Sequence, residues 1–362
     1  MKIPYLPQSL PISLDWTQFI TLIGSANAEL ARYDGILQSI INPRVLLSPL
    51  TTNEAVLSSK IEGTQASLHE VLAYEASPKV HTEKYNDIQE IINYRKALDH
   101  AIKYLDKKPI TLNLVKEIHG ILLNSVRGRD KARGEFRSIQ NFIGRLGSKI
   151  EDAIFIPPAP LGMMEHLFNF EKYIHYDEKD RLVQLAFIHA QFELIHPFLD
   201  GNGRVGRILI PLFLFEKQVL KYPMFYISEY LEKNRDEYYS CLNAISEDNN
   251  WNNWIKFFLT AIIEQSKTNS IKAKAILALY EIKKERITEV THSQYGIKIL
   301  DAIFTKPIFN TSEFINISQI PRPTAKRVLI KLKEKGILSS IIKASGRRAE
   351  VLAFDKLLKI IG

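Results

Sequence analysis

The sequence predicts a mainly α-helical protein that carries one small β-hairpin and ends in a domain of three helices and a β wing. Three observations predict this fold class. Apolar residues recur with helical spacing along most of the 362 residues. β-rich runs around a glycine turn stand out at two places, residues 141–156 and 337–354. A hydrophobic share of 46% is enough for a full core and for two or three domains.

Charge and composition limit the function classes. The net charge is +8, and residues 271–362 hold about 18 Lys and Arg against about 8 Asp and Glu. This asymmetry indicates either an anionic partner of the C-terminal part or a solvated lysine-rich surface. Cys241 is the one cysteine, which excludes an intramolecular disulfide framework and a multi-cysteine metal site. Without an apolar run long enough for a membrane span or a signal peptide, we expect a cytoplasmic protein without membrane contact.

The N-terminal part is expected to be helical after a proline-rich start. Residues 1–16 are expected to be extended, and residues 15–41 have helical periodicity. Two amphipathic helices are expected further on, at residues 83–104 and 113–123. These helices would wrap the core.

A shorter helix between these segments carries polar residues on one face. Thr52 or Asn53 is suited to cap its start, and Gly63 is suited to end it. Ser58 and Glu62 are four residues apart, so both side chains lie on the same face. By itself Glu62 is most simply a surface charge. The alternative is a carboxylate that reaches an arginine of another element.

Residues 141–156 contain two short β-rich runs around a Gly147-Ser148 turn, which favours a hairpin. An ordinary connector is the alternative. The apolar run 181–195 that follows predicts a buried helix. His189, Glu193 and His196 share the spacing of a zinc site, but we favour a packed core histidine at position 189, because His196 belongs to a better-matched set of residues.

That set lies in the stretch QFELIHPFLDGNGRVGR, residues 191–207. His196 titrates near neutral pH and can accept a proton from an attacking hydroxyl. Asp200 is a hard oxygen ligand suited to Mg²⁺. The glycine-flanked turn 201–203 can present backbone N–H groups to an anion at the start of the apolar helix 208–215. Arg204 and Arg207 are three apart and reach out from one helix face. The stretch therefore predicts a site that holds a metal-bound polyphosphate beside a nucleophile.

These residues carry a resemblance. His196 to Arg207 resembles the HxFx(D/E)GNGRxxR signature of Fic-domain proteins at every signature position. The resemblance implies a Fic-type helical core and transfer of AMP from ATP to a Ser, Thr or Tyr hydroxyl of a protein. It implies His196 as the general base and Asp200 as the Mg²⁺ ligand. The implied ATP-binding residues are Gly201, Asn202, Gly203, Arg204, Val205, Gly206 and Arg207, with Glu62, Ile143, Gly144, His196 and Tyr239.

The upstream helix gains a role from the same resemblance. Ser58 to Gly63 is similar to the (S/T)xxxE(G/N) inhibitory motif of many Fic proteins. In that family the glutamate pairs with the second signature arginine, which implies that Glu62 withdraws Arg207 from the γ-phosphate. Ser58 would hold the helix against the nucleotide loop.

Two further segments are interpreted by the resemblance. In Fic proteins the 141–156 segment is a flap that pairs with a strand of the target protein, and Ile143 and Gly144 would lie near the nucleotide. Tyr238 or Tyr239 packs either on adenine or in the core, and the family favours Tyr239 for the adenine contact. A position that some relatives fill with Asn falls near Ser246, which leaves the base pocket open.

The C-terminal residues resemble a winged helix-turn-helix domain. Helices are expected at residues 295–304, near 311–314 and at 323–335, followed by a hairpin. The basic residues suited to contact DNA are Lys326, Arg327 and Lys331 on the third helix and Arg347 and Arg348 on the wing. A protein-interaction module with the same fold is the alternative.

The leading expectation is an autoinhibited protein adenylyltransferase that uses ATP and Mg²⁺, its own chain being one conceivable target. The alternatives are removal of AMP from a modified protein with the help of Glu62, and a transcription regulator with a nucleotide-sensing Fic core. We expect an N-terminal region with the inhibitory motif at 1–110, a catalytic core at 111–266, a connecting helix at 267–290 and the winged domain at 291–362. A homodimer is a further expectation from the resemblance.

Overall fold

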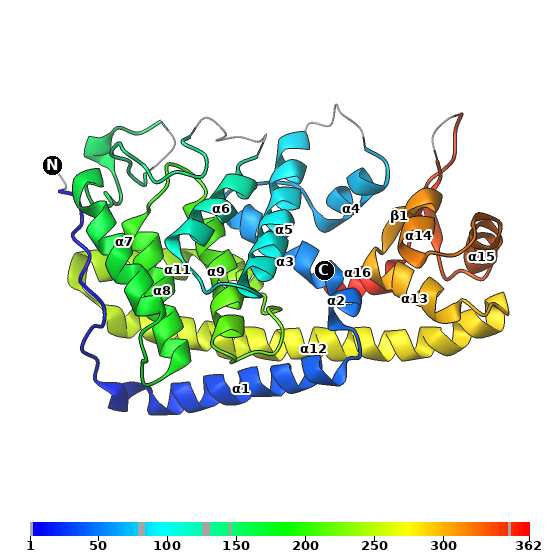
Figure 1. Cartoon of the computed structure of the whole chain (residues 1–362), viewed down its shortest axis with the longest axis horizontal. Coiled ribbons are helices and arrows are strands. Elements are labelled where there is room, and N and C mark those ends of the chain that lie inside the picture. The colour runs from blue at the N-terminus through cyan, green and yellow to red at the C-terminus, as the bar shows by residue number, and fades with distance from the viewer. Residues whose placement is uncertain (1–2, 79–83, 125–130, 145–146, 347–348) are drawn as a thin grey trace. The chain divides into compact units, whose positions relative to one another are not determined.

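The computed structural model describes residues 3–78, 84–124, 131–144, 147–346 and 349–362 (Figure 1). The chain forms two compact units that alternate along the sequence. Unit 1 comprises Met1–Asp34, Leu57–Gly63 and Asn93–Lys267. Unit 2 comprises Gly35–Val56, Thr64–Ile92 and Thr268–Gly362. Both are largely helical, and the named strands of the described ranges form one three-stranded sheet, so the predicted mainly α fold class is confirmed.

Unit 1 is built from helices. It contains η1 (Trp16–Phe19), α6 (Leu112–Leu122), η2 (Ile150–Asp152), α7 (Pro160–Ile174), α8 (Arg181–Ile195), α9 (Asn202–Glu216), α10 (Ser228–Lys233) and α11 (Arg235–Asp248). Some helices have residues in both units: α1 (Ile20–Ser39), α3 (Ser48–Ile61), α5 (Tyr85–Leu105) and α12 (Trp251–Thr291).

Helix α8 lies at the centre of unit 1, where it packs against α7, α9 and α11 (Figure 1). All of its residues are buried except Arg181 and Glu193. Asp180 caps its start, because the carboxylate accepts hydrogen bonds from the N–H groups of Leu182 and Val183, both at 2.9 Å. An apolar sequence without helical alternation therefore gives a helix that is buried all round.

Helix α3 differs from its prediction at one end. It begins at Ser48, so Thr52 and Asn53 lie inside the helix and do not cap it. Pro49 is compatible with this earlier start, because a proline in the first turn needs no N–H partner. Gly63 follows the end of the helix with φ at 98°, as predicted.

The predicted hairpin at 141–156 is less regular than expected. Its pairing is one antiparallel bridge between Ile143 and Phe155, and the 3-10 helix η2 precedes the second partner. Pro157 and Pro158 follow directly and have no N–H to donate, so a longer strand cannot form on that side.

The connecting helix predicted at 267–290 is the second part of one continuous helix, α12, which begins at Trp251 within the predicted core. No glycine or proline interrupts this stretch, so nothing in the sequence breaks the backbone hydrogen bonding. The prediction of a break was wrong because it followed the change in composition rather than a helix-ending residue.

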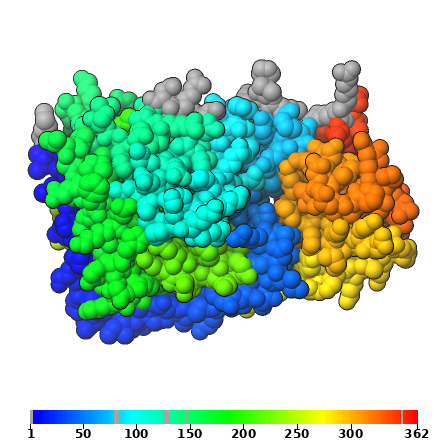
Figure 2. All heavy atoms as spheres, viewed as in Figure 1, coloured from blue at the N-terminus to red at the C-terminus, as the bar shows by residue number. Residues whose placement is uncertain are grey.

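Unit 2 combines short helices with the sheet. Its elements are α2 (Pro43–Leu46), α4 (Leu68–Ala76), α13 (Gly296–Thr305), β1 (Ile308–Asn310), α14 (Thr311–Ser318), α15 (Arg322–Glu334), β2 (Ser339–Ile342), β3 (Val351–Ala353) and α16 (Asp355–Ile361). The sheet is antiparallel with strand order β1-β3-β2. Three helices precede the β2–β3 pair, as predicted, whereas β1 and α16 were not predicted. The residues from α13 onward gather in one packed body (Figure 2).

Helix α4 is attached to this sheet. Leu72 and Ala76 pack in one apolar cluster with Ile308, Val351 and Ala353. The Asn310 side chain also donates to the carbonyl of Ala76 at 2.6 Å. Within unit 2, the α4 segment is therefore part of the same core as the C-terminal strands. Among the described residues, no helix has the length and apolar character needed to cross a membrane.

Candidate functional site

His196 ends helix α8 in a left-handed conformation, with φ at 48°. Its Nδ1 lies 3.2 Å from the carbonyl oxygen of Glu193. A carbonyl only accepts hydrogen bonds, so the proton belongs on Nδ1 and the lone pair of Nε2 is available. Burial lowers the pKa of His196 to about 4. The imidazole is therefore neutral at pH 7 and can accept a proton at Nε2, and the expectation that it titrates near neutral pH is wrong because burial disfavours its charged form.

The loop after His196 is fixed by its own side chains. Phe198 is fully buried, and Asn202 binds its backbone twice, accepting from the N–H and donating to the carbonyl, each at 2.8 Å. Gly201 has φ at 79°, a region that favours glycine, and it precedes the first residue of α9. The first N–H groups of α9 thus start directly after this turn, as an anion site requires.

Asp200 and Arg204 lie at the edge of this loop. The Asp200 carboxylate is 41% exposed, and in the described part of the chain it pairs with Nη2 of Arg204 at 3.4 Å. No cluster of three or more acidic, histidine or cysteine ligands occurs among the described residues. A single half-exposed carboxylate fits Mg²⁺, which usually binds through one or two carboxylates together with phosphate oxygens and water.

Arg207 is 1% exposed and is held by helix α3. Its Nε donates to Ser58 Oγ at 2.8 Å, and its Nη2 donates to the Ser58 carbonyl at 2.9 Å and to Glu62 Oε1 at 2.6 Å. Burial alone would raise the pKa of Glu62, but the charge and the hydrogen bond of Arg207, together with the charge of Arg204, outweigh it, and the net shift of that pKa is downward. The ion pair predicted from the sequence is therefore present in the structure.

Glycine at position 203 is required by this pair. A Cβ atom there would lie 2.2 Å from Glu62 Oε1 and 2.8 Å from Arg207 Nη1. A side chain at this position would displace Glu62 or Arg207, so in this arrangement the first turn of α9 approaches the ion pair through bare backbone.

Glu193 is a second acid at this site. Its Oε1 is buried without a hydrogen-bond partner among the described residues and would lie 2.3 Å from a Cβ atom at Gly206. Burial raises the pKa of Glu193 to about 8, with Arg207 opposing and Glu62 adding to the shift. Sequence reasoning considered Glu193 only in a zinc trio. Glu193 lies three residues before His196 on the same helix face, and this spacing was the sequence signal that the two belong to one site.

The aromatic residues of α11 take different places. Tyr238 is buried, and its hydroxyl lies 2.9 Å from His189 Nε2, which makes His189 a packed core histidine. Tyr239 is 38% exposed, with the Arg235 guanidinium 5.7 Å from its ring centroid. Burial and then the charge of Glu62 raise the pKa of Tyr239, which places its hydroxyl in the field of the ion pair. Ser246 Oγ binds the Asn243 carbonyl at 2.8 Å.

The flap residues Ile143 and Gly144 belong to unit 1. Ile143 is 39% exposed, and its N–H donates to the Phe155 carbonyl at 2.8 Å. A Cβ atom at Gly144 would lie 2.7 Å from Ser148 Oγ. Val205 is fully buried on α9, so it supports the phosphate loop from inside the core.

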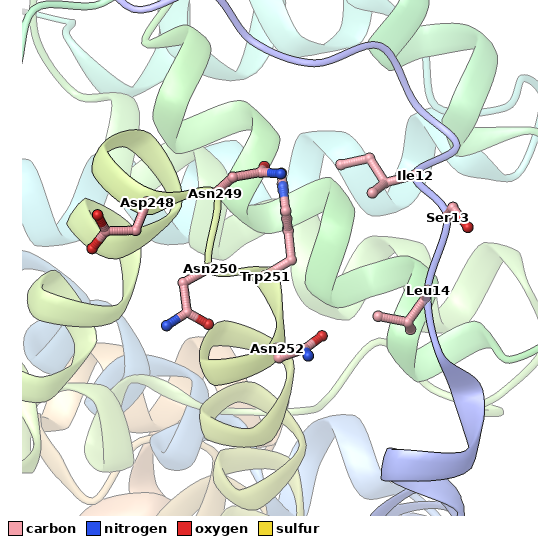
Figure 3. Close-up of a pocket in the computed structure, with 8 residues that line it drawn as sticks. All are labelled: Ile12, Ser13, Leu14, Asp248, Asn249, Asn250, Trp251 and Asn252. Carbon is pink, nitrogen blue, oxygen red and sulfur yellow. The ribbon is translucent and has the colours of Figure 1, made fainter.

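On α15 of unit 2, Lys326 and Arg327 are exposed and Lys331 is half-buried. The other two predicted DNA contacts, Arg347 and Arg348, lie outside the described residues. A separate pocket of about 300 Å³ lies in unit 1 between Ile12–Leu14 and the turn Asp248–Asn252 (Figure 3). None of the predicted site residues lines it.

Sequence comparison places most of the first 214 residues in known families. Residues 20–103 match the Fic/DOC family N-terminal model, and residues 109–214 match the Fic/DOC family model. Together they cover more than half of the chain. The structure agrees with this class of protein. It is mainly helical, His196 follows α8, a glycine turn precedes α9, and Arg207 is paired with the upstream Glu62. The chain belongs to the Fic/DOC family.

Named relatives are similar at modest identity. A probable protein adenylyltransferase of Aquifex aeolicus is 26% identical over 305 residues, which cover 82% of this chain and 81% of the relative. A protein adenylyltransferase Fic of Drosophila grimshawi is 29% identical over 158 residues, 41% of this chain. That match spans 29% of the fly protein, so the chain covers less than a third of this longer relative.

Solved structures share the fold. A Fic family protein of Desulfovibrio desulfuricans superposes with a TM-score of 0.60 at 17% identity, covering 96% of this chain and 98% of the other. Fic-1 of C. elegans superposes with a TM-score of 0.55 at 22% identity and covers 71% of each chain.

Proposed function

We propose that this protein is an autoinhibited protein adenylyltransferase that moves AMP from ATP to a Ser, Thr or Tyr hydroxyl of a protein, its own chain included. The observation that carries the proposal is the 2.6 Å pair between Glu62 and Arg207 beside an unprotonated His196 Nε2. The adenylyltransferase names of the Aquifex and fly relatives support the same reaction class.

The reaction uses His196 as the base. Its Nε2 takes the proton of the target hydroxyl while the hydroxyl oxygen attacks the α-phosphorus of ATP. The bond from the α-phosphorus to the bridging oxygen breaks, and pyrophosphate leaves with that oxygen. The N–H groups at the start of α9 and the Arg204 and Arg207 guanidinium groups bind the phosphate oxygens. Asp200 would hold Mg²⁺, which neutralises phosphate charge when bound.

Inhibition follows from competition for one guanidinium. Arg207 has its Nε on Ser58 and its Nη2 on Ser58 and Glu62, so it is not available to a γ-phosphate. A charge-assisted hydrogen bond of this kind contributes about 1.5–3 kcal/mol. When Glu62 withdraws, Arg207 is released to the triphosphate and ATP takes the transferable pose.

The test is transfer of label from α-labelled ATP to protein. We expect strong labelling by Glu62→Gly, little labelling by wild type and none by Glu62→Gly with His196→Ala. Equal labelling by the single and the double variant would contradict the role of His196. Release of AMP from a labelled protein by wild type, but not by Glu62→Gly, would instead support the removal reaction.

We further propose that the target docks its backbone along the 141–156 flap. Ile143 is the paired, partly exposed residue of this segment, and strand addition places few demands on target side chains. Ile143→Pro removes its N–H and should reduce labelling of a protein target. Binding of ATP is measured separately, because Ile143 is also expected near the nucleotide, and a loss of labelling no larger than the loss of ATP binding would contradict docking on the flap.

A second candidate function is binding of duplex DNA through unit 2. The α15 cations Arg322, Lys326 and Arg327 are exposed and make no ion pair among the described residues, whereas Lys333 is paired with Glu350 at 2.8 Å. An exposed basic helix that follows a short turn after another helix suits a major groove. Lys326→Ala with Arg327→Ala should weaken DNA binding and reduce the salt slope by about 2.

The matched control for this experiment is Lys356→Ala with Lys359→Ala, which removes two exposed charges from α16 of the same unit. An equal loss in both double variants would mean that net charge, and not α15, determines the binding.

A homodimer stays a prediction from the resemblance.

A further inference from the structure

His119 of α6 is fully buried, and both of its ring nitrogens are engaged. The Gly134 N–H donates to Nδ1 at 2.9 Å. An amide only donates, so Nδ1 carries no proton and the ring proton belongs on Nε2. Nε2 lies 3.1 Å from the main-chain carbonyl oxygen of Asp200 and donates to it. One tautomer of one imidazole thus joins Gly134 to Asp200.

The ring also lies against the loop that contains the proposed Mg²⁺ ligand. It stacks on Phe198 with a centroid distance of 3.8 Å and an angle of 10° between the planes. A Cβ atom at Gly201 would lie 3.7 Å from His119 Cδ2. The imidazole therefore contacts the loop at residue 198 and residue 201 and binds its main chain at residue 200 between them.

The Gly134 end of this contact leads back to the same loop. Gly134 has φ at 76° and begins a segment that reaches Arg137, a nearly buried cation. The Arg137 N–H donates to the Pro197 carbonyl at 2.9 Å, and its Nε donates to the His196 carbonyl at 2.9 Å. The loop is consequently held at both ends, by Arg137 at residues 196–197 and by His119 at residue 200.

We propose that His119 is a positioning residue for adenylyl transfer, whose hydrogen bond to the Asp200 main chain aims the Asp200 carboxylate at the metal–nucleotide complex. The carboxylate itself is 41% exposed, and within the described ranges its ion-pair contact is to Arg204, at 3.4 Å. Side-chain contacts this weak do not fix its direction, so the main chain must. The proposal rests on the proposed function of the site.

Two substitutions separate the hydrogen bond from packing. His119→Phe keeps an aromatic ring against Phe198 and removes both hydrogen bonds, leaving the Asp200 carbonyl without its donor. His119→Gln restores an N–H near the Nε2 position and gives up the ring. Gln184→Met is the matched control, because Gln184 is equally buried in unit 1 but donates to the Tyr173 and Tyr176 carbonyls. All three are made with Glu62→Gly, so that activity is measurable.

The readout is binding of a non-hydrolysable ATP analogue with and without Mg²⁺, measured by calorimetry, together with labelling rates. Loss of a group that orients a metal ligand typically lowers metal affinity or activity by about 10- to 100-fold. Mg²⁺ raises the affinity of the parent for the analogue by a certain factor, and we expect this factor to be about tenfold smaller in His119→Phe. The affinity measured without Mg²⁺ should fall less. His119→Gln should recover part of the gain, and Gln184→Met should keep it.

An unchanged Mg²⁺-dependent gain in His119→Phe, or an equal loss in Gln184→Met at the same melting temperature, would overturn the proposal. Failure of Glu62→Gly itself to label protein would count against the proposed function and not against His119. Binding of the analogue still reports on His119 in that case, because it needs no transfer.

Discussion

Arg207 is a buried cation whose partners come from a helix that lies far upstream in the sequence. A buried charge is tolerated only when it is paired and hydrogen-bonded, and Ser58 and Glu62 supply these partners. The same requirement would stabilise the proposed inhibited state, because the arginine without a phosphate needs a substitute anion. In our proposal a triphosphate and Glu62 are alternatives at one guanidinium.

At this scale Ser58 is predicted to share the inhibition. Ser58→Ala removes the acceptor of Arg207 Nε and should raise labelling on the order of tenfold, less than Glu62→Gly does. Ser59→Ala is the control, since Ser59 is equally buried but its hydroxyl has no partner among the described residues. Label incorporation measures both. An equal rise in the two variants would indicate a general loosening of α3.

Helices α8 and α9 place the chemistry at the scale of elements. The proposed base, His196, follows the end of α8, the proposed phosphate-binding turn precedes α9, and the two helices pack against each other. Their positions depend on the caps. Asp180→Ala removes two hydrogen bonds at the start of α8 and should lower the unfolding free energy by about 1 kcal/mol.

Thermal unfolding measures this change. Asp180→Asn should lose less, because asparagine caps helices about as well as aspartate and only the bond that Asn27 Nδ2 donates to Oδ2 at 2.9 Å is lost. A loss in Asp180→Asn as large as in Asp180→Ala would mean that the cap does not carry the effect.

Much of the site could be predicted because it lies within twelve consecutive residues. His196, Asp200 and Arg207 have a register that two helices and a glycine turn fix locally. The partnership of Glu62 and Arg207 came from the family resemblance, since no local rule joins residues 145 positions apart. His119 and Glu193 were missed as site residues because their roles depend on packing between α6, α8 and the loop. An apolar helix pattern contains no signal for such contacts.

Stability of the whole molecule should fall on both sides of a pH optimum. Burial lowers the pKa values of His119, His189 and His196 to about 4, 3 and 4, so these groups are neutral in the folded state. The unfolded chain takes up their protons first, and stability is lost as pH falls from about 6.5 toward 4. Glu193 lowers stability on the alkaline side of the optimum.

The pKa of about 8 for Glu193 means that the folded state keeps a proton that the unfolded chain has already released. Stability from this group is complete below the unfolded pKa of about 4.5 and is lost as pH rises toward 8, by about 2 kcal/mol between pH 6 and pH 8. Glu193→Gln should flatten this alkaline decline in melting temperature and leave the acid side unchanged. An unaltered alkaline decline would contradict a protonated Glu193.

The most direct test of the account is the rate of label incorporation from α-labelled ATP with Glu, Gln or Gly at position 62. If the carboxylate at Arg207 is the inhibitor, the rate rises from Glu to Gln to Gly, and His196→Ala abolishes it in each background. A rate that is the same for all three residues would show that the pair between Glu62 and Arg207 does not control the reaction.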